Sequence, residues 1–162
     1  VLRVLPYLDL SELNLDGSHA IAKKGGELVI DNPFAKDGFN STEERLKHFG
    51  FIDDRIKVKH FVSREDYITY MKNGHVFLSC ARSEGWNLPL IEAMACGTPC
   101  VTTNIGDAAL IVDDSGWVSP PNDPIALANA IIEAIQERSR DERLWILKKQ
   151  NCRDRIVQNF SF

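Results

Sequence analysis

Apolar and polar positions change their spacing along the chain, and each spacing favours one kind of element. Residues 28–30 (LVI) and 75–80 (HVFLSC) are short, continuous apolar runs, which are typical of strands covered on both faces. Residues 55–62 (RIKVKHFV) alternate with a period of two, which also predicts a strand. Residues 99–103 and 117–118 have the character of two further short strands. The pattern therefore predicts several short strands, most of them buried.

Helix signals separate these strands. Most predicted helices open with a capping side chain, followed by acidic residues or a proline in the first turn. The predicted helices cover residues 41–49, 63–72, 88–96, 124–136 and 141–159. Gly50, Gly74 and Gly97 stand at or just after the ends of three of them, where glycine commonly ends a helix.

The strands and helices alternate, which predicts an α/β fold: a Rossmann-like parallel sheet with helices on both faces. Such sheets bind ligands outside the carboxyl ends of their strands. The first 27 residues are less regular. Residues 1–9 have the character of a strand, whereas residues 11–26 contain three glycines and no clear period, so we expect a loop there. The pattern predicts a single domain over residues 1–162, with residues 1–27 poorly defined.

Composition agrees with a globular domain. The chain has 162 residues, of which 44% are hydrophobic and 26% charged, enough for one domain with a substantial core. No apolar run is long enough to span a bilayer. The net charge of −4 argues against a nucleic-acid binder but allows a local basic pocket. The chain starts with Val1 rather than Met, which fits a piece of a longer protein.

Four cysteines occur without a C-x-x-C pair and without histidines at metal-binding spacing: Cys80, Cys96, Cys100 and Cys152. A zinc site is therefore not expected. We predict that all four are reduced and mostly buried, where they act as small hydrophobic side chains. Reduced thiols are typical of the cytoplasm, so the expected localisation is cytoplasmic. A peripheral position of the full-length protein at the inner face of a membrane stays open.

The segment SEGWNLPLIEAMACGTP, residues 83–99, joins a predicted strand end to a helix start and carries two carboxylates. The free amides and positive dipole of a helix N-terminus favour an anion such as a diphosphate. Gly85 has no side chain to keep a ligand from the backbone. Glu92, about one turn into the helix, could accept hydrogen bonds from a ribose, and Glu84 from a sugar beyond the phosphates. The two acids bracket a phosphate position, as a nucleotide-sugar would require.

A structural interpretation of the same segment also stays open. An acid early in a helix complements the helix dipole without binding anything, and this could be the role of Glu92. The apolar side chains of the segment are expected mainly in the core. They are Trp86, Leu88, Leu90, Ile91 and Met94.

Residues 80–101 (CARSEGWNLPLIEAMACGTPCV) resemble the hallmark PSxxEGFGLPxxEAMAxGxPVV of group-1 glycosyltransferases, a family of retaining enzymes with the GT-B architecture. Shorter segments resemble the same family: NIGD at 104–107, PPNDP at 120–124 and FSF at 160–162. The resemblance extends over residues 28–162. It implies the C-terminal, nucleotide-sugar-binding half of a GT-B enzyme, without the N-terminal domain that binds the acceptor.

The resemblance also implies roles for individual residues. Glu84 would be the catalytic residue, which binds the hydroxyls of the donor sugar and stabilises the sugar as its bond to phosphate breaks. Glu92 would bind the ribose. The other donor-binding residues would be Gly85, Trp86, Asn87 and Leu88 around the diphosphate, and Phe61 and Val62 beside the base. Such enzymes do not need a divalent metal bound through a D-x-D motif, and the sequence has none. No metal or cofactor is therefore expected besides the nucleoside-diphosphate sugar, which is the substrate.

Two positions depart from the family pattern. The family carries an Arg and a Lys that contact the diphosphate after the first strand of this domain, and no such pair follows the first predicted strand here. Arg3, Lys23 and Lys24 are candidates only by position, and a solvated lysine pair before a glycine turn explains the last two equally simply. Asn87 replaces a glycine of the phosphate loop. Because Asn tolerates positive φ better than most residues, we expect the loop to be retained.

The expected function is hexosyl transfer from a nucleoside-diphosphate sugar to an acceptor hydroxyl, in polysaccharide or glycolipid synthesis. The isolated chain is expected to be inactive, because the resemblance assigns the acceptor to the missing domain. Three alternatives stay open: a non-catalytic nucleotide-sugar-binding or regulatory domain, another GT-B enzyme such as a nucleotide-sugar epimerase or a sugar phosphorylase, and a response-regulator-like domain. The last would need an acidic cluster after its first strand, where only Asp9 stands. The donor base and sugar, the acceptor and the oligomeric state are left open.

Overall fold

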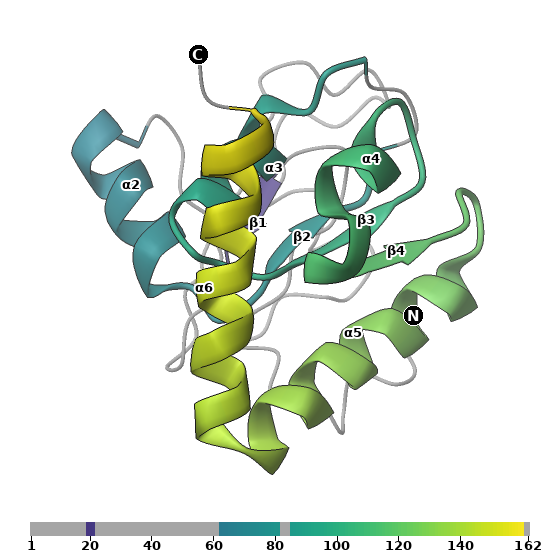
Figure 1. Ribbon diagram of the computed structural model, residues 1–162. Helices are drawn as coiled ribbons and strands as arrows, with labels where there is room; N and C mark the ends of the chain where they lie inside the picture. Colours follow the sequence, from purple (N-terminus) through teal and green to yellow (C-terminus); the bar gives the residue numbers. More distant parts are fainter. Residues whose placement is uncertain (1–18, 22–61, 82–84, 161–162) are drawn as a thin grey trace.

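A computed structural model describes residues 19–21, 62–81 and 85–160. Four strands form one sheet in the order β1-β2-β3-β4 (Figure 1). Their bounds are β1 His19–Ile21, β2 Phe77–Ser79, β3 Cys100–Thr103 and β4 Trp117–Ser119. β2, β3 and β4 run parallel, as the alternation of elements predicts, whereas β1 pairs with β2 in the antiparallel direction. The predicted elements at 1–9, 28–30 and 41–49, and all but the last residue of the one at 55–62, lie outside the described residues.

The helices that connect and cover the sheet begin where the capping signals place them, except for α4, whose first turn has no side-chain cap. They are α2 Arg64–Asn73, α3 Leu88–Ala95, α4 Ala108–Val112, α5 Pro124–Arg140 and α6 Glu142–Asn159, with a 3-10 turn at Asp113–Ser115. The side chains of four cap residues accept hydrogen bonds from amides two or three residues further on. These caps are Ser63, Asn87, Asp123 and Asp141. No helix in the described part of the chain is both long and apolar enough to cross a membrane.

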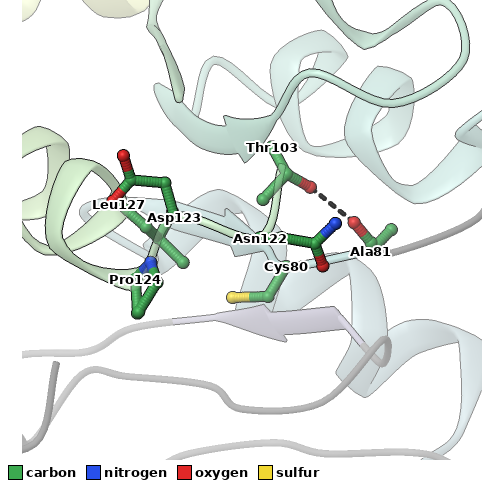
Figure 2. Close-up of a pocket in the computed structure, with 7 residues that line it drawn as sticks. All are labelled: Cys80, Ala81, Thr103, Asn122, Asp123, Pro124 and Leu127. Carbon is green, nitrogen blue, oxygen red and sulfur yellow. Dashed lines mark hydrogen bonds between the residues drawn. The ribbon is translucent and has the colours of Figure 1, made fainter. Parts of the chain in front are cut away.

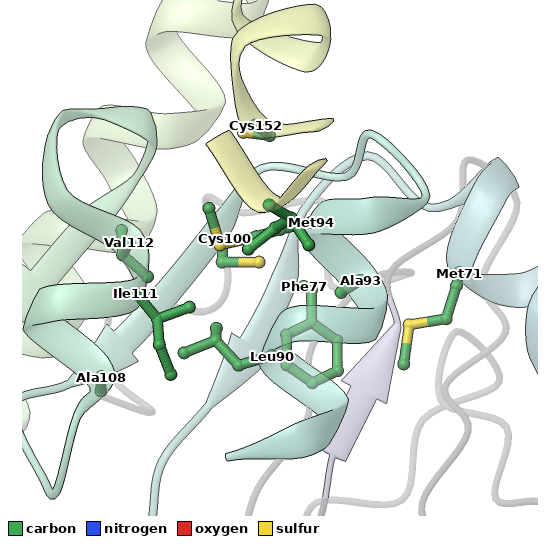
Figure 3. Packing of buried hydrophobic residues seen from close by; sticks show 11 residues of the cluster. Met71, Phe77, Leu90, Ala93, Met94, Cys100, Ala108, Ile111, Val112 and Cys152 are labelled. Carbon is green, nitrogen blue, oxygen red and sulfur yellow. The ribbon is translucent and has the colours of Figure 1, made fainter. Parts of the chain in front are cut away.

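Alternate residues of the parallel strands contribute side chains to two apolar clusters, one on each face of the sheet. Phe77 and Cys100 point into a cluster formed with α2, α3, α4 and the second half of α6 (Figure 3). Leu78 and Val101, the next residues along the same strands, point into a second cluster formed with β4, α5 and the start of α6. Helices therefore cover both faces, which confirms the predicted layers.

Three expectations about the elements need correction. The segment 11–26 contains strand β1, where the sequence favours a loop, because three residues are too few to show a period of two. Helix α4 was not predicted, since its five residues (AALIV) span little more than one helical turn. Helix α5 continues to Arg140 instead of ending near residue 136. Its last turn is polar, so hydrophobic spacing does not reveal it.

All four cysteines are free thiols. Cys100 and Cys152 are buried, whereas Cys80 and Cys96 are half-buried. Burial raises the pKa of Cys152 to about 12 and the pKa of Cys100 well above its ordinary value. Because the reactive form of cysteine is the thiolate, these two thiols are inert parts of the core.

Candidate functional site

The carboxyl ends of the three parallel strands lie at one edge of the sheet. Ser79 is the last residue of β2, and Thr103 of β3 pairs with Ser119, the last residue of β4. Helices α3 and α5 both start at this edge, because each follows a strand of the parallel set. The ends of three strands and two helix N-termini are thus brought together, and residues 85–88, at the start of α3, are among them.

Asn87 fixes the start of α3 to the end of β2. Its side chain is buried, donates a hydrogen bond from Nδ2 to Ser79 Oγ at 3.0 Å, and accepts one at Oδ1 from the Leu90 amide at 3.2 Å. Its φ is −81°, so Asn87 does not use the positive φ that asparagine tolerates. Asn87 occupies this position as a helix N-cap. Asn122, in the segment PPNDP, is the asparagine that does adopt a left-handed conformation, with a φ of 57°.

Replacing Asn87 with alanine is expected to lower the free energy of unfolding by about 1–3 kcal/mol, because the helix loses its cap and Ser79 loses a buried partner. Asn87→Asp keeps an oxygen that can cap the helix but cannot donate to Ser79, so it should lose less. Urea unfolding monitored by circular dichroism measures both. An alanine variant as stable as the parent would contradict the role of Asn87 as anchor.

The amides at the start of α3 are only partly available to a ligand. The Leu88 amide donates to the Trp86 carbonyl at 3.0 Å, the Leu90 amide is capped by Asn87, and Pro89 has no amide hydrogen. Towards other described residues, the amides of Gly85, Trp86 and Asn87 make no hydrogen bonds. A Cβ built on Gly85 would meet nothing within 4 Å. Among the described residues, the amides left available to an anion in this structure are therefore those just before the helix.

Two large apolar side chains of the segment are exposed at this edge. Leu90 and Met94 are fully buried, as expected for core residues, but Trp86 is 42% exposed and Leu88 is 58% exposed. The Trp86 ring contacts Phe160, which follows α6, with ring centroids 5.8 Å apart. The core expectation is therefore wrong for Trp86 and Leu88. Their exposure at the ends of the strands gives a ligand or a further domain an apolar surface.

Glu92 lies one turn into α3 and is held by two donors from α2. Arg64 donates to Glu92 Oε1 at 2.9 Å, and the Tyr67 hydroxyl donates to Glu92 Oε2 at 2.8 Å. Burial, and then the hydrogen bond to Glu92, raise the pKa of Tyr67 well above its ordinary value. The hydroxyl therefore keeps its proton and remains a donor. The Glu92 carboxylate is fixed in place, with about one third of its side chain exposed.

Sequence analysis did not single out Arg64 or Tyr67. One signal was available: α2 follows a predicted strand, so its first turns had to lie near the carboxyl edge of the sheet. Val62 precedes the α2 cap and is half-buried. The predicted site residues Glu84 and Phe61 lie outside the part of the chain that the structure describes.

A cavity of about 250 Å³ opens at the same edge, on the side of α5 (Figure 2). It is lined by Cys80, Ala81, Thr103, Asn122, Asp123, Pro124 and Leu127. The Thr103 hydroxyl donates to the Ala81 carbonyl at 2.7 Å, which joins the ends of β2 and β3 beside the cavity. Ligand pockets commonly measure about 300–1,000 Å³, so this cavity is too small for a whole nucleotide-sugar. No group of three or more His, Cys, Asp or Glu residues that could hold a metal occurs in the described ranges.

This chain is similar to known proteins in sequence and in fold. The O-antigen chain mannosyltransferase B of Escherichia coli is 30% identical over 111 residues, which are 66% of this chain and 29% of that protein. A glycosyltransferase from Rickettsia africae ESF-5 has a similar fold, with a TM-score of 0.69 and 22% identity, over 83% of this chain and 35% of its own. Anabaena Alr3699/HepE, solved in complex with UDP and glucose, has a TM-score of 0.60 and 22% identity, over 74% of this chain and 31% of its own.

These matches confirm the Rossmann-like α/β fold, and the chain spans about a third of the length of the proteins it matches. The family model for glycosyl transferases group 1 matches residues 36–150. This range is well over half of the chain and contains α2, α3 and the segment 83–99. The chain therefore belongs to the group 1 glycosyltransferase family.

Proposed function

We propose that this chain is the donor-binding domain of a retaining glycosyltransferase. The full-length protein transfers a hexosyl group from a nucleoside-diphosphate sugar to an acceptor hydroxyl, in polysaccharide or glycolipid synthesis. The observation that carries the proposal is the Glu92 carboxylate, held by two donors one turn into α3 at the carboxyl edge of the sheet. A relative named as an O-antigen chain mannosyltransferase and a neighbour solved with UDP and glucose support it.

In this proposal, different site residues bind the base, the ribose, the diphosphate and the sugar of the donor. Glu92 accepts hydrogen bonds from the ribose, and the amides of Gly85, Trp86 and Asn87 bind the diphosphate. Phe61 and Val62 lie beside the base. Glu84, two residues before the exposed Trp86, binds the sugar and stabilises the positive charge that develops as the bond to phosphate breaks. The leaving phosphate departs from the face that the acceptor attacks, so the anomeric configuration is kept.

The charge on the leaving diphosphate is balanced without a divalent metal. Backbone amides and the dipole of α3 supply part of the stabilisation, and cations of the full-length protein supply the rest. The acceptor is bound by a second domain outside this chain, which agrees with the chain's spanning only about a third of its relatives. The isolated chain therefore does not catalyse transfer. The full-length protein acts in the cytoplasm, where nucleotide-sugars are its substrates.

A panel of nucleoside diphosphates and their sugars tests this proposal. UDP, GDP and ADP, each alone and as its glucose or mannose derivative, are added to the full-length protein, and the melting temperature is measured. A ligand that binds only the folded state raises it, by an amount set by the ratio of concentration to Kd. At least one base should do so, with the sugar derivative bound in the same site. A folded protein that responds to none of them would refute the proposal.

A further inference from the structure

The hydroxyl of Tyr67 contacts a carboxylate oxygen on another helix. Tyr67 lies one turn into α2 and its Oη is 2.8 Å from Glu92 Oε2, part-buried between the two helices. The Tyr67 ring packs against the apolar cluster that contains Leu90, Ala93 and Met94 of α3. A hydroxyl on a packed ring has few alternative positions. The direction of its hydrogen bond to Glu92 is therefore set by the core.

Helix α2 itself is tied to the segment that follows α3. The Thr98 hydroxyl donates to the Met71 carbonyl of α2, and both residues are fully buried. Ser63 caps the start of the helix, and the Gly74 amide donates to the Tyr70 carbonyl at its end. Tyr67 thus projects from a helix that is fixed at both ends, towards a carboxylate on a helix fixed by Asn87.

Arg64 makes the second contact with Glu92, and its side chain is more exposed to water than that of Tyr67. Its guanidinium donates to Oε1 at 2.9 Å, but its side chain is 71% exposed. Exposed ion pairs of this kind contribute little, because water screens the charges and the long side chain loses freedom. Of the two donors that hold Glu92, the part-buried hydroxyl therefore contributes more to the orientation of the carboxylate than the exposed guanidinium does.

The two contacts leave acceptor capacity on Glu92. A carboxylate offers about four lone-pair positions, and Arg64 and Tyr67 use one on each oxygen. The remaining positions can accept from two neighbouring hydroxyls at once. A vicinal diol, such as the 2′ and 3′ hydroxyls of a ribose, has two donors at the required separation. A rotated carboxylate would meet only one of them.

We propose that Tyr67 is a positioning residue, which orients Glu92 so that the site selects ribonucleotides over 2′-deoxyribonucleotides. The inference rests on the proposed function, in which Glu92 binds the ribose. Tyr67 does not itself touch the nucleotide and acts through Glu92. Its effect should therefore appear in the discrimination between the two kinds of nucleotide and disappear when Glu92 is changed.

Tyr67→Phe removes the hydroxyl and keeps the ring in the core. Tyr70→Phe is the matched control. It removes a hydroxyl from the same helix, three residues after Tyr67. Kd values of the full-length protein are measured by calorimetry for UDP, GDP and ADP and for their 2′-deoxy counterparts. Melting temperatures establish that each variant is folded. Tyr67→Met, which fills similar space without a donor, replaces Tyr67→Phe if the latter does not fold.

The ratio of the Kd for the 2′-deoxynucleotide to the Kd for the ribonucleotide is expected to fall in Tyr67→Phe by roughly three- to tenfold, the effect of about one hydrogen bond. The Kd for the 2′-deoxynucleotide should change by less than about twofold. Tyr70→Phe should leave the ratio unchanged. In a Glu92→Gln background, Tyr67→Phe should have no further effect on the ratio.

Failures of the two proposals are distinguishable. If the parent protein binds none of the nucleotides, or if Glu92→Gln leaves the ratio unchanged, the proposed function of Glu92 is wrong, and the role of Tyr67 falls with it. If the parent discriminates and Glu92→Gln abolishes discrimination, but Tyr67→Phe leaves the ratio intact, only the positioning role is refuted. Equal weakening of both nucleotides by Tyr67→Phe would also refute it, since that result indicates a general structural effect.

Discussion

Glu84→Ala in the full-length protein is expected to abolish sugar transfer while nucleoside-diphosphate binding persists. In the proposed site, the Glu84 carboxylate faces the donor sugar, where positive charge develops as the bond to phosphate breaks. Loss of one group that stabilises transition-state charge costs roughly 100- to 1,000-fold in kcat. In the same proposal, the nucleotide is bound separately, by Glu92 and by the amides before α3. Product formation is followed by NMR of the anomeric proton, which also reports whether configuration is kept.

Two further variants make the result specific. Glu84→Gln keeps the shape of the side chain and loses its charge, so it should be nearly as inactive as the alanine variant. Glu133→Ala removes an exposed carboxylate from the middle of α5 and should transfer sugar at the rate of the parent. Normal turnover by Glu84→Ala would show that Glu84 has no part in the reaction. Loss of nucleotide binding in the same variant would assign Glu84 to the binding of the nucleotide instead.

Phe77→Ala should lower the free energy of unfolding by about 3–5 kcal/mol, the usual cost of removing a fully buried aromatic side chain. Phe77 is 0% exposed at the start of β2 and belongs to the cluster that carries Leu90 and Ala93 of α3 (Figure 3). Small domains are stable by about 5–15 kcal/mol, so this loss is a large part of the total. The cavity that the substitution leaves would lie against α3, so donor binding should weaken as well.

Urea unfolding followed by circular dichroism measures the loss for Phe77→Ala. Phe77→Leu refills most of the space with apolar atoms and should cost less than half as much. The outcome that would count against the account is a similar, small loss for both variants. It would mean that the α3 side of the sheet is loosely packed and does not position the site rigidly.

Capping signals and apolar runs predict most of the described fold because both act locally. Asp123 with Pro124, and Asp141 at the next start, place α5 and α6 within a residue of their observed beginnings. Buried strands such as β2 show as continuous apolar runs. Strand β1 and helix α4 were missed, since three and five residues carry too little of a period to stand out. They form because the neighbouring strand β2 and the core stabilise them.

The candidate site is less accessible to sequence reasoning, because its contacts join distant parts of the chain. The two carboxylates and the loop before α3 are visible in one motif. The pairing of Glu92 with Arg64 and Tyr67 spans 28 and 25 residues and depends on how α2 packs against α3. The contact that fixes the conformation of Asn87 is also out of reach of sequence reasoning. Its side chain reaches Ser79 of β2, and that bond selects the capping conformation over a positive φ.

The position of Trp86 allows one measurement to test the central claim, that a nucleoside diphosphate binds at the start of α3. This chain has three tryptophans, and their indole N–H signals can be assigned among those of the full-length protein by Trp→Phe variants. Trp86 is exposed beside the proposed diphosphate position. Trp117 and Trp145 stack on each other and are buried in the apolar cluster formed with β4, α5 and the start of α6. Titration with UDP, GDP or ADP should shift the Trp86 signal and leave the other two in place. An unmoved Trp86 signal in protein saturated with a nucleoside diphosphate, as judged by calorimetry, would contradict the account.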